Sequence, residues 1–318
     1  MNHALVVTLL ASAVAYGTPL LLGGLGELLA ERSGILNLGL EGMMLVGAVV
    51  GFWISQSNPG PTSVTLALAL LGAIAAGALM GLVHAIVTIA FEANQVVSGL
   101  ALTIFGGAIG LSSYLASSAS LGGQPGHHQF QPIDVFGLKD LPVVGPLLFH
   151  QDAMVYLSWA LTLATVWYLY HSRFGLHLRS VGESPHSADS MGVNVAAYRY
   201  VHTVVGGAFA GMAGAYFSLA LTPSWADGLT AGAGWIALGL VIFAFWRPGL
   251  LVVGAYLFGL VTSLGFTLQS RGVKLPPELF AALPYLLTIV VLVLVSSVWS
   301  RRRLGAPAGL GQPFRREE

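Results

Sequence analysis

Residues 31–54 read ERSGILNLGLEGMMLVGAVVGFWI, a polar segment that runs directly into an apolar one. The apolar part continues long enough for a membrane span, which needs about 20 such residues. Glu41 stands at its start, among apolar neighbours. An ionised carboxylate facing hydrocarbon costs about 2.5–3.5 kcal/mol or more, so Glu41 must face protein or water. This stretch therefore predicts a membrane helix that carries a carboxylate with a specific partner.

The composition of the whole chain is that of a membrane protein. Charged residues make up 8% of the 318 residues and apolar residues 55%, whereas a soluble domain carries about 25% charged residues. The formal net charge is zero, which gives no reason to expect a nucleic-acid partner. Because the apolar runs are continuous and do not alternate with a period of two, we expect an all-α polytopic bundle, not a β-barrel.

Apolar runs of spanning length predict about nine transmembrane helices, with a range of eight to ten. We expect residues 1–300 to form one transmembrane domain, in which the first run is a retained span because no basic region precedes it. The 233–246 run is short enough to be half of a broken helix. Spaced pairs of glycines predict close helix packing: Gly47/Gly51, Gly77/Gly81, Gly106/Gly110 and Gly207/Gly211. The expected spans are 4–22, 35–54, 64–91, 95–116, 153–171, 201–221, 233–246, 249–268 and 283–300.

Basic residues predict which ends of the spans face the cytoplasm. Three arginines lie in the 172–200 connection, and five lie in 301–318, which we expect to be a basic cytoplasmic tail. Threading nine spans with this tail inside makes the polar, Gly- and Pro-rich segment 117–152 an extracytoplasmic loop. Four tryptophans near span ends are expected to be interfacial anchors: Trp159, Trp167, Trp246 and Trp299.

Several kinds of chemistry are excluded by the residues present. A nucleotide-binding P-loop needs a lysine followed by Ser or Thr, but Lys139 precedes Asp140 and Lys274 precedes Leu275. Cysteines are absent and the histidines lack metal-ligand spacing. We therefore expect no enzyme activity, cofactor or metal site, and any ATP-driven step must come from another chain.

Two polar features lie within the expected spans and are candidates for a substrate path. Asn37 and Glu41 are four residues apart, so on a helix they would share a face. Polar residues from Gln95 to Thr103 recur at helical spacing. Alternatively, Glu41 is bonded to backbone or to Arg32, and the polar stripe from Gln95 to Thr103 only allows tight helix packing. The candidate path residues are Asn37, Glu41, Asn94, Gln95, Ser98, Thr103 and Trp235.

The 172–200 connection contains the signature of a short capped helix over about 184–192. Ser184 can cap it, Pro185 suits its first position, and Gly192 suits a left-handed exit. Such a helix could lie on the membrane surface, but we favour docking to a cytoplasmic partner. We expect the charged residues before the helix to hold the start of the helix in register. The candidate coupling residues are Arg179, Glu183, Ser184, Pro185, Ala188 and Gly192.

Long blocks of the chain resemble a known family. The blocks are GELLAERSGILNLGLEGMMLVGA, FEANQVVSGLALTIFG, FGLHLRSVGESPHSADSMGVNVAAYR and DGLTAGAGWIALGLVIFAFWRP, followed by LPYLLTIVVLVLV. In this order they are similar to permease subunits of ATP-binding-cassette (ABC) importers for simple sugars, nucleosides and branched-chain amino acids. They look most like the nucleoside-uptake branch, in which the 183–192 stretch corresponds to the coupling helix that docks on the ATPase.

The resemblance implies partners and a location. It implies ABC ATPase subunits, a second permease that is identical or related, an extracytoplasmic substrate-binding protein or lipoprotein, and a multi-pass position among the lipids of a bacterial inner membrane. The substrate would be a small neutral solute, with a nucleoside preferred over a ribose-like simple sugar. An ion-coupled secondary transporter is the alternative, but it would need paired or chained carboxylates, whereas Glu41 looks almost alone in the spans. A scaffold or receptor is a third possibility.

Overall fold

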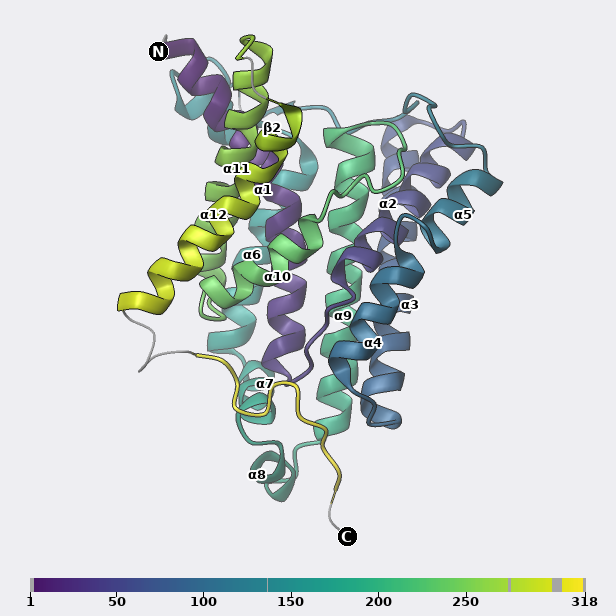
Figure 1. The fold of residues 1–318 in the computed structure, drawn as a ribbon, viewed down its shortest axis with the longest axis vertical. Coiled ribbons are helices and arrows are strands. Elements are labelled where there is room, and N and C mark those ends of the chain that lie inside the picture. Colours follow the sequence, from purple (N-terminus) through teal and green to yellow (C-terminus); the bar gives the residue numbers. More distant parts are fainter. Residues whose placement is uncertain (1–2, 136, 274–275, 299–304, 317–318) are drawn as a thin grey trace.

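Nearly all of the regular structure is helical in the computed structural model, which describes residues 3–135, 137–273, 276–298 and 305–316 (Figure 1). Within these residues, seven helices are long and apolar enough to cross a membrane, and two shorter apolar helices accompany them. The polytopic all-α bundle is thus confirmed, while the count of nine spans stays a prediction. The apolar helices are α1 (His3–Arg32), α2 (Leu40–Ser57), α3 (Thr62–Ala85), α4 (Gln95–Gly106), α5 (Leu111–Ser118), α6 (Ala153–His171), α9 (Val195–Tyr216), α10 (Ala233–Phe243), α11 (Pro248–Ser270) and α12 (Pro277–Val298).

Several expected spans have different ends in the structure. The first span continues to Arg32 instead of ending at residue 22, because two carboxylates in its last turns are buried within protein. The expected span 95–116 is broken between α4 and α5, where Gly107 is extended. A Cβ added to Gly107 would lie 2.5 Å from the Thr103 carbonyl oxygen, so a larger residue would crowd this break. Helices α3 and α9 each end in a wider turn, η1 (Ile86–Ala90) and η3 (Phe217–Leu221).

The core surrounds α1, which packs against α9, α10 and α11. Its leucines at four successive inward positions are fully buried: Leu21, Leu22, Leu25 and Leu28. Beside it, α2, α3 and α9 meet through glycines, as the spaced glycine pairs predict. A Cβ added to Gly77 would lie 2.2 Å from the carbonyl oxygen of Gly207, so the two backbones touch directly. Small residues therefore set the spacing of these three helices.

The two ends of the bundle carry different structures (Figure 1). At the end that holds the N-terminus, the long loop after α5 contains β1 (Ile133–Asp134) paired antiparallel with β2 (His150–Gln151), and η2 (Gly145–Phe149). At the opposite end lie α7 (Arg173–Glu183), α8 (Pro185–Ser190) and the C-terminal segment. Arg32 Nη2 donates to the Trp246 carbonyl at 2.8 Å, and Arg199 Nη1 donates to the Gln312 carbonyl at 3.0 Å. Basic residues thus gather at one end, in agreement with the charge-based threading.

Trp246 is not an interfacial anchor. Its side chain is 4% exposed, and its indole Nε1 donates a hydrogen bond to Glu31. The ring lies in the tight turn between α10 and α11, where protein and not lipid surrounds it. Trp167, by contrast, is exposed on α6 as an anchor would be, and Trp299 lies outside the described residues.

Candidate functional site

Two non-helical connections lie inside the bundle and create its central junction. Residues 33–39 rise from the lower end of α1 before α2 begins, and residues 222–232 descend from the upper end of α9 and η3 to α10 (Figure 1). Gly34 at φ +92° and Gly232 at φ +81° adopt left-handed backbone that glycine accepts without a steric cost. Helices α2 and α10 can therefore begin within the bundle.

Glu41 joins the beginnings of these two helices. Its Oε1 accepts hydrogen bonds from the Thr230 hydroxyl at 2.5 Å and from the Gly232 N–H at 2.9 Å, while Oε2 accepts from the Gly234 N–H at 2.6 Å. The first N–H groups of a helix have no partners within that helix, and Gly232 has no side chain to cap α10. Glu41 supplies the cap from another helix, where its charge also favours the positive end of the helix dipole. The expected bonding to backbone is confirmed, and Arg32 is not the partner.

Asn37 does not share a helix face with Glu41, because α2 begins only at Leu40. The Asn37 N–H donates to Glu27 Oε1 at 3.1 Å, and its side-chain Oδ1 accepts from the Gly39 N–H at 3.0 Å. An Asn side chain that bonds the backbone two residues onward forms a local turn and competes with helix formation. That local turn is the physical reason why the spacing of four residues misled the sequence prediction.

The polar stripe of α4 faces the 33–39 connection. Gln95 Oε1 accepts from the Leu36 N–H at 2.7 Å, and the Thr103 hydroxyl donates to the Leu38 carbonyl at 2.7 Å. Ser98 Oγ lies 2.9 Å from His84 Nδ1. These side chains satisfy backbone groups that a buried connection would otherwise leave unpaired. The stripe therefore packs tightly against the connection; its part in a substrate path stays a prediction.

The two remaining path candidates lie apart from this network. Asn94 caps α4, its Oδ1 accepting from the Val97 N–H at 3.1 Å. Trp235 stands on α10 with 38% of its surface exposed. Neither contributes to the junction held by Glu41, and their part in a substrate path likewise stays a prediction.

Two buried carboxylates were missed by the sequence reasoning, which took Glu41 as almost alone. Glu27 and Glu31 lie one turn apart near the end of α1, and both are fully buried. Glu27 Oε1 accepts from the Asn37 N–H, and Glu31 Oε2 accepts from the Trp246 indole. Within the described residues, the second oxygen of each carboxyl has no hydrogen-bond partner. The sequence did contain a signal for this pair: the two glutamates are four residues apart, one helical turn, just beyond the expected end of the first span.

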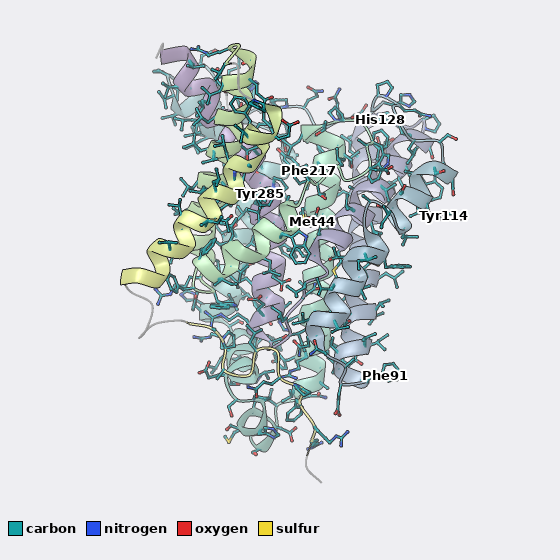
Figure 2. All side chains as sticks on the ribbon, in the orientation of Figure 1. Met44, Phe91, Tyr114, His128, Phe217 and Tyr285 are labelled. Carbon is teal, nitrogen blue, oxygen red and sulfur yellow. The ribbon has the colours of Figure 1, made fainter. Side chains whose placement is uncertain are left out.

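A cavity of about 220 Å³ opens beside the Glu41 junction, between α1, η3, α10, α11 and α12. Tyr16 and Phe266 stack in its wall with ring centroids 5.2 Å apart, and the Tyr285 hydroxyl donates to the Ala231 carbonyl at 2.8 Å. Figure 2 shows Phe217 and Tyr285 on the side of the bundle that the cavity occupies. Its lining contains no Asp, Glu, His, Lys or Arg. The aromatic and hydroxyl-bearing residues that line it are Tyr16, Phe217, Phe266, Tyr285, Thr222, Thr230 and Thr262.

The cavity was not anticipated from the sequence, because isolated aromatic and threonine residues are ordinary constituents of membrane spans. Two of its hydroxyls, those of Tyr16 and Thr222, make no hydrogen bond within the described part of the chain, so they are available to a ligand. A polar hydroxyl inside an apolar, aromatic cavity can fix the orientation of a bound solute. Among the described residues no group of His, Asp and Glu side chains could hold a metal ion.

The short capped helix expected near residue 185 is present as α8. Ser184 Oγ accepts from the Ser187 N–H at 3.4 Å, and Gly192 exits with φ +82°. Ala188 is buried against Val181 of α7 and Val195 of α9. Helix α7, which precedes α8, was not predicted, since its polar face of Arg and His resembles a loop in a sequence so rich in apolar runs.

Arg179 does not hold the start of α8 in register with Glu183. The guanidinium lies over the Tyr170 ring, 5.6 Å from the ring centroid, and Glu183 is exposed. A cation over an aromatic face is a favourable contact, and here it ties α7 to the end of α6. The register of α8 is set instead by its own cap and by burial of Ala188.

Comparison with known proteins places this architecture in a family. Residues 9–292 match the family described as branched-chain amino acid transport system / permease component. A putative glucose ABC transporter permease of Haloferax volcanii is 41% identical, over 97% of this chain and 98% of the relative. A nucleoside ABC transporter permease of Lactococcus lactis is 34% identical, over 90% and 91%. A guanosine ABC transporter permease of Bacillus subtilis is 33% identical, over 95% of each chain.

No solved structure matches the chain. The family match covers most of the helical bundle, including the Glu41 junction, α8 and the residues that line the cavity. The chain therefore belongs to the branched-chain amino acid transport system / permease component family, as a multi-pass protein of the cell membrane.

Proposed function

We propose that this chain is the permease subunit of an ATP-driven ABC importer that carries a small neutral solute, with a nucleoside as the preferred class. The names of its relatives support an ABC permease. Because neither lysine of the chain stands in a P-loop, ATP hydrolysis is assigned to separate ATPase subunits. A second permease and an extracytoplasmic substrate-binding protein complete the proposed complex, and α8 is the proposed contact with the ATPase.

The lining of the cavity is the observation that carries the choice of substrate. A nucleoside has a flat base that stacks on aromatic rings and a sugar whose hydroxyls need hydrogen-bonding partners. Four aromatic rings and three threonine hydroxyls meet in this cavity, and no charged side chain lines it. The ammonium and carboxylate groups of an amino acid would be desolvated there without partners, which is costly. The chemistry of the cavity thus favours a neutral, ring-bearing solute.

A simple sugar is the second candidate, because the relative at 41% identity is named as a putative glucose permease. Sugar hydroxyls could use the same threonine and tyrosine groups. A sugar lacks the base, however, so it would leave much of the aromatic surface in the cavity without a stacking partner. The two candidates therefore differ in how strongly transport should depend on the aromatic rings.

Competition for uptake separates the two classes. In cells that lack other nucleoside routes, unlabelled adenosine or guanosine should block uptake of a labelled nucleoside by the complex, while glucose or ribose should not. Phe217→Ala, which removes a ring from the cavity, should weaken nucleoside uptake; Phe174→Ala, at an exposed ring on α7, is the matched control. Competition by a free sugar alone, or by leucine alone, would contradict the nucleoside assignment.

A further inference from the structure

The C-terminal segment 305–316 is docked across the cytoplasmic end of the bundle and does not extend freely into solvent (Figure 1). The Gly309 N–H donates to the Gly182 carbonyl at the end of α7, at 2.8 Å. The Gly311 N–H donates to the Gly34 carbonyl in the connection between α1 and α2, at 3.1 Å. Two backbone hydrogen bonds thus join segment 305–316 to two different parts of the permease.

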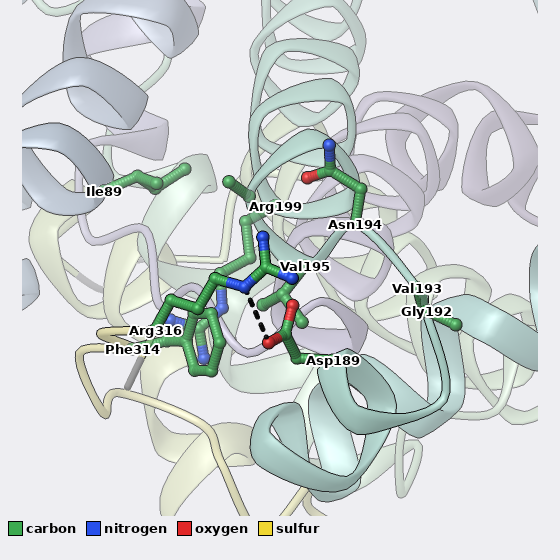
Figure 3. A pocket seen from close by; sticks show the side chains of 10 residues that line it. Ile89, Asp189, Gly192, Val193, Asn194, Val195, Arg199, Phe314 and Arg316 are labelled. Atoms are coloured by element: carbon green, nitrogen blue, oxygen red, sulfur yellow. Dashed lines mark ion pairs between the residues drawn. The ribbon is translucent and has the colours of Figure 1, made fainter. Parts of the chain in front are cut away.

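The side chains that follow extend these contacts to α8 and to the turn before α4. Arg315 donates to both carboxylate oxygens of Glu92, each at 3.2 Å. Arg316 Nε lies 3.2 Å from Asp189 Oδ2 on α8, and Figure 3 shows this ion pair at the rim of a pocket of about 450 Å³. Between these arginines and the docked backbone, the Phe314 ring lies beneath the Arg199 guanidinium and beside the His186 ring.

Backbone burial, more than charge, fixes the position of segment 305–316. Arg315 and Arg316 are 81% and 76% exposed, and exposed ion pairs contribute about 0–1 kcal/mol each. Pro307 and Gly309, by contrast, are buried. A Cβ on Gly309 would lie 2.9 Å from the Gly182 carbonyl oxygen and 3.1 Å from Pro185 Cδ, so only glycine fits between α7 and α8. Gly309 is therefore the residue on which the docking depends.

We propose that segment 305–316 is a brace that makes α8, the base of α4 and the connection between α1 and α2 move as one unit. It contacts α8 through Asp189 and His186, the turn before α4 through Glu92, and the connection through Gly34. That connection leads directly to Glu41 and the start of α10. A displacement of α8 would thereby reach the junction at the centre of the bundle. This inference rests on the proposed function, in which the ATPase acts on α8.

The brace can be tested first in the permease alone, where its outcome does not depend on the ATPase. The chain has no cysteine, so cysteines can be introduced for spin labels at Met191 and Phe91, which are 84% and 75% exposed on the two sides of the brace. Double electron–electron resonance measures the distance between the two labels, and it should give one narrow distance distribution in the parent. Gly309→Val and deletion of 305–318 should broaden it, and Ala308→Ser, at an exposed neighbour, should not. An unchanged distribution in both altered proteins would overturn the proposal.

The second measurement uses the assembled complex. Gly309→Val should lower substrate-stimulated ATP hydrolysis by at least about fivefold, the lower end of the usual range for coupling between sites, while Ala308→Ser keeps the parental rate. A broadened distance distribution with unchanged stimulation would overturn the coupling role of the brace. If the parent permease bound no ATPase at all, the proposed function would fail, whereas the distance measurement would still decide whether the brace exists.

Discussion

Glu41 illustrates how a membrane helix can carry a carboxylate without exposing it to lipid. Its two oxygens accept three hydrogen bonds from one short segment, the hydroxyl of Thr230 and the first N–H groups of α10. Each of these donors would lack a partner without it, because α10 begins inside the bundle. Burying the carboxylate therefore carries a desolvation cost, but its oxygens satisfy three donors at once. Hydrogen bonds to a charged acceptor are stronger than those between neutral groups.

Removing this acceptor should destabilise the protein. In Glu41→Leu three donors lose their partner, and an unsatisfied buried group costs about 1–3 kcal/mol, so the free energy of unfolding should fall by about 3 kcal/mol or more. Glu41→Gln keeps one acceptor oxygen and should have an intermediate stability. Thermal unfolding in detergent and transport assays measure the effect. A Leu variant with parental stability and transport would show that the junction does not depend on Glu41.

Asp152 should make the stability of the protein depend on pH. It caps α6, accepting from the N–H groups of Met154 and Val155, and it accepts from the Tyr216 hydroxyl at 2.6 Å. Burial raises the pKa of the Asp152 carboxyl above its ordinary value of 3.8, although these hydrogen bonds oppose the rise. The folded protein then binds the proton more tightly than the unfolded chain does. The contribution of Asp152 is therefore fully present below the ordinary pKa and is lost as pH rises to the raised folded pKa.

The matched variant is Asp152→Asn, which keeps a cap oxygen but cannot titrate. As pH rises from about 4, the unfolding temperature of the parent should fall relative to that of this variant. Above the folded pKa of Asp152 the difference should become constant. A difference that does not vary with pH over this window would contradict the raised pKa.

At the level of helices, glycine contacts hold α2, α3 and α9 together. A Cβ on Gly77 would lie 2.2 Å from the Gly207 oxygen and 2.7 Å from the Gly211 nitrogen, both of them backbone atoms that cannot turn aside. Gly77→Ala should therefore lower stability by about 1–3 kcal/mol through overpacking. Gly239→Ala on α10, where the new Cβ would meet a ring atom at an ordinary 3.8 Å, is the control. Equal thermal stability of the two variants would refute the close packing.

Helix α8 offers a test of rigidity that leaves the spans untouched. A Cβ on Gly192 would meet no atom within 4 Å, yet its φ of +82° is strained for other residues. Gly192→Val should cost about 1–2 kcal/mol of local strain and weaken association with the ATPase, while the thermal stability of the bundle stays parental. Gly192→Asn is the control, because Asn tolerates this conformation better. Parental ATPase binding by the Val variant would contradict the role assigned to α8.

The elements that could be predicted from the sequence are those set by local patterns. Long apolar runs predict most helices, and the signals at Ser184, Pro185 and Gly192 predict α8, because caps and left-handed exits depend on adjacent residues. The buried connection at 33–39 could not be predicted, since its partners on α4 lie about sixty residues away. Asn37 was placed on a helix for a local reason, because its side-chain turn with Gly39 ends the helical pattern before Leu40 and was not recognised.

At the scale of the whole molecule, the basic tail shows the limit of composition as a guide. Its arginines fit a solvated cytoplasmic segment, and only long-range contacts to Gly182 and Gly34 show that its described part, residues 305–316, is docked. The cavity beside the Glu41 junction was hidden for a related reason: its walls come from five separate helical elements. Exposed apolar side chains on α3 and α4 suit contact with lipid or with a second permease; they include Leu71, Leu79, Ile104 and Phe105.

The source of energy for transport is the property that tests the ABC permease assignment most directly. Uptake of a labelled nucleoside should be measured in cells that carry the complete complex, with the P-loop lysine of the ATPase subunit intact or replaced, and with or without an ionophore. Uptake should be lost when that lysine is replaced and should persist at first when the ionophore collapses the ion gradients. Uptake that survives replacement of the lysine but stops with the ionophore would instead identify an ion-coupled transporter, for which the buried pair Glu27 and Glu31 would supply the paired carboxylates that such a transporter needs.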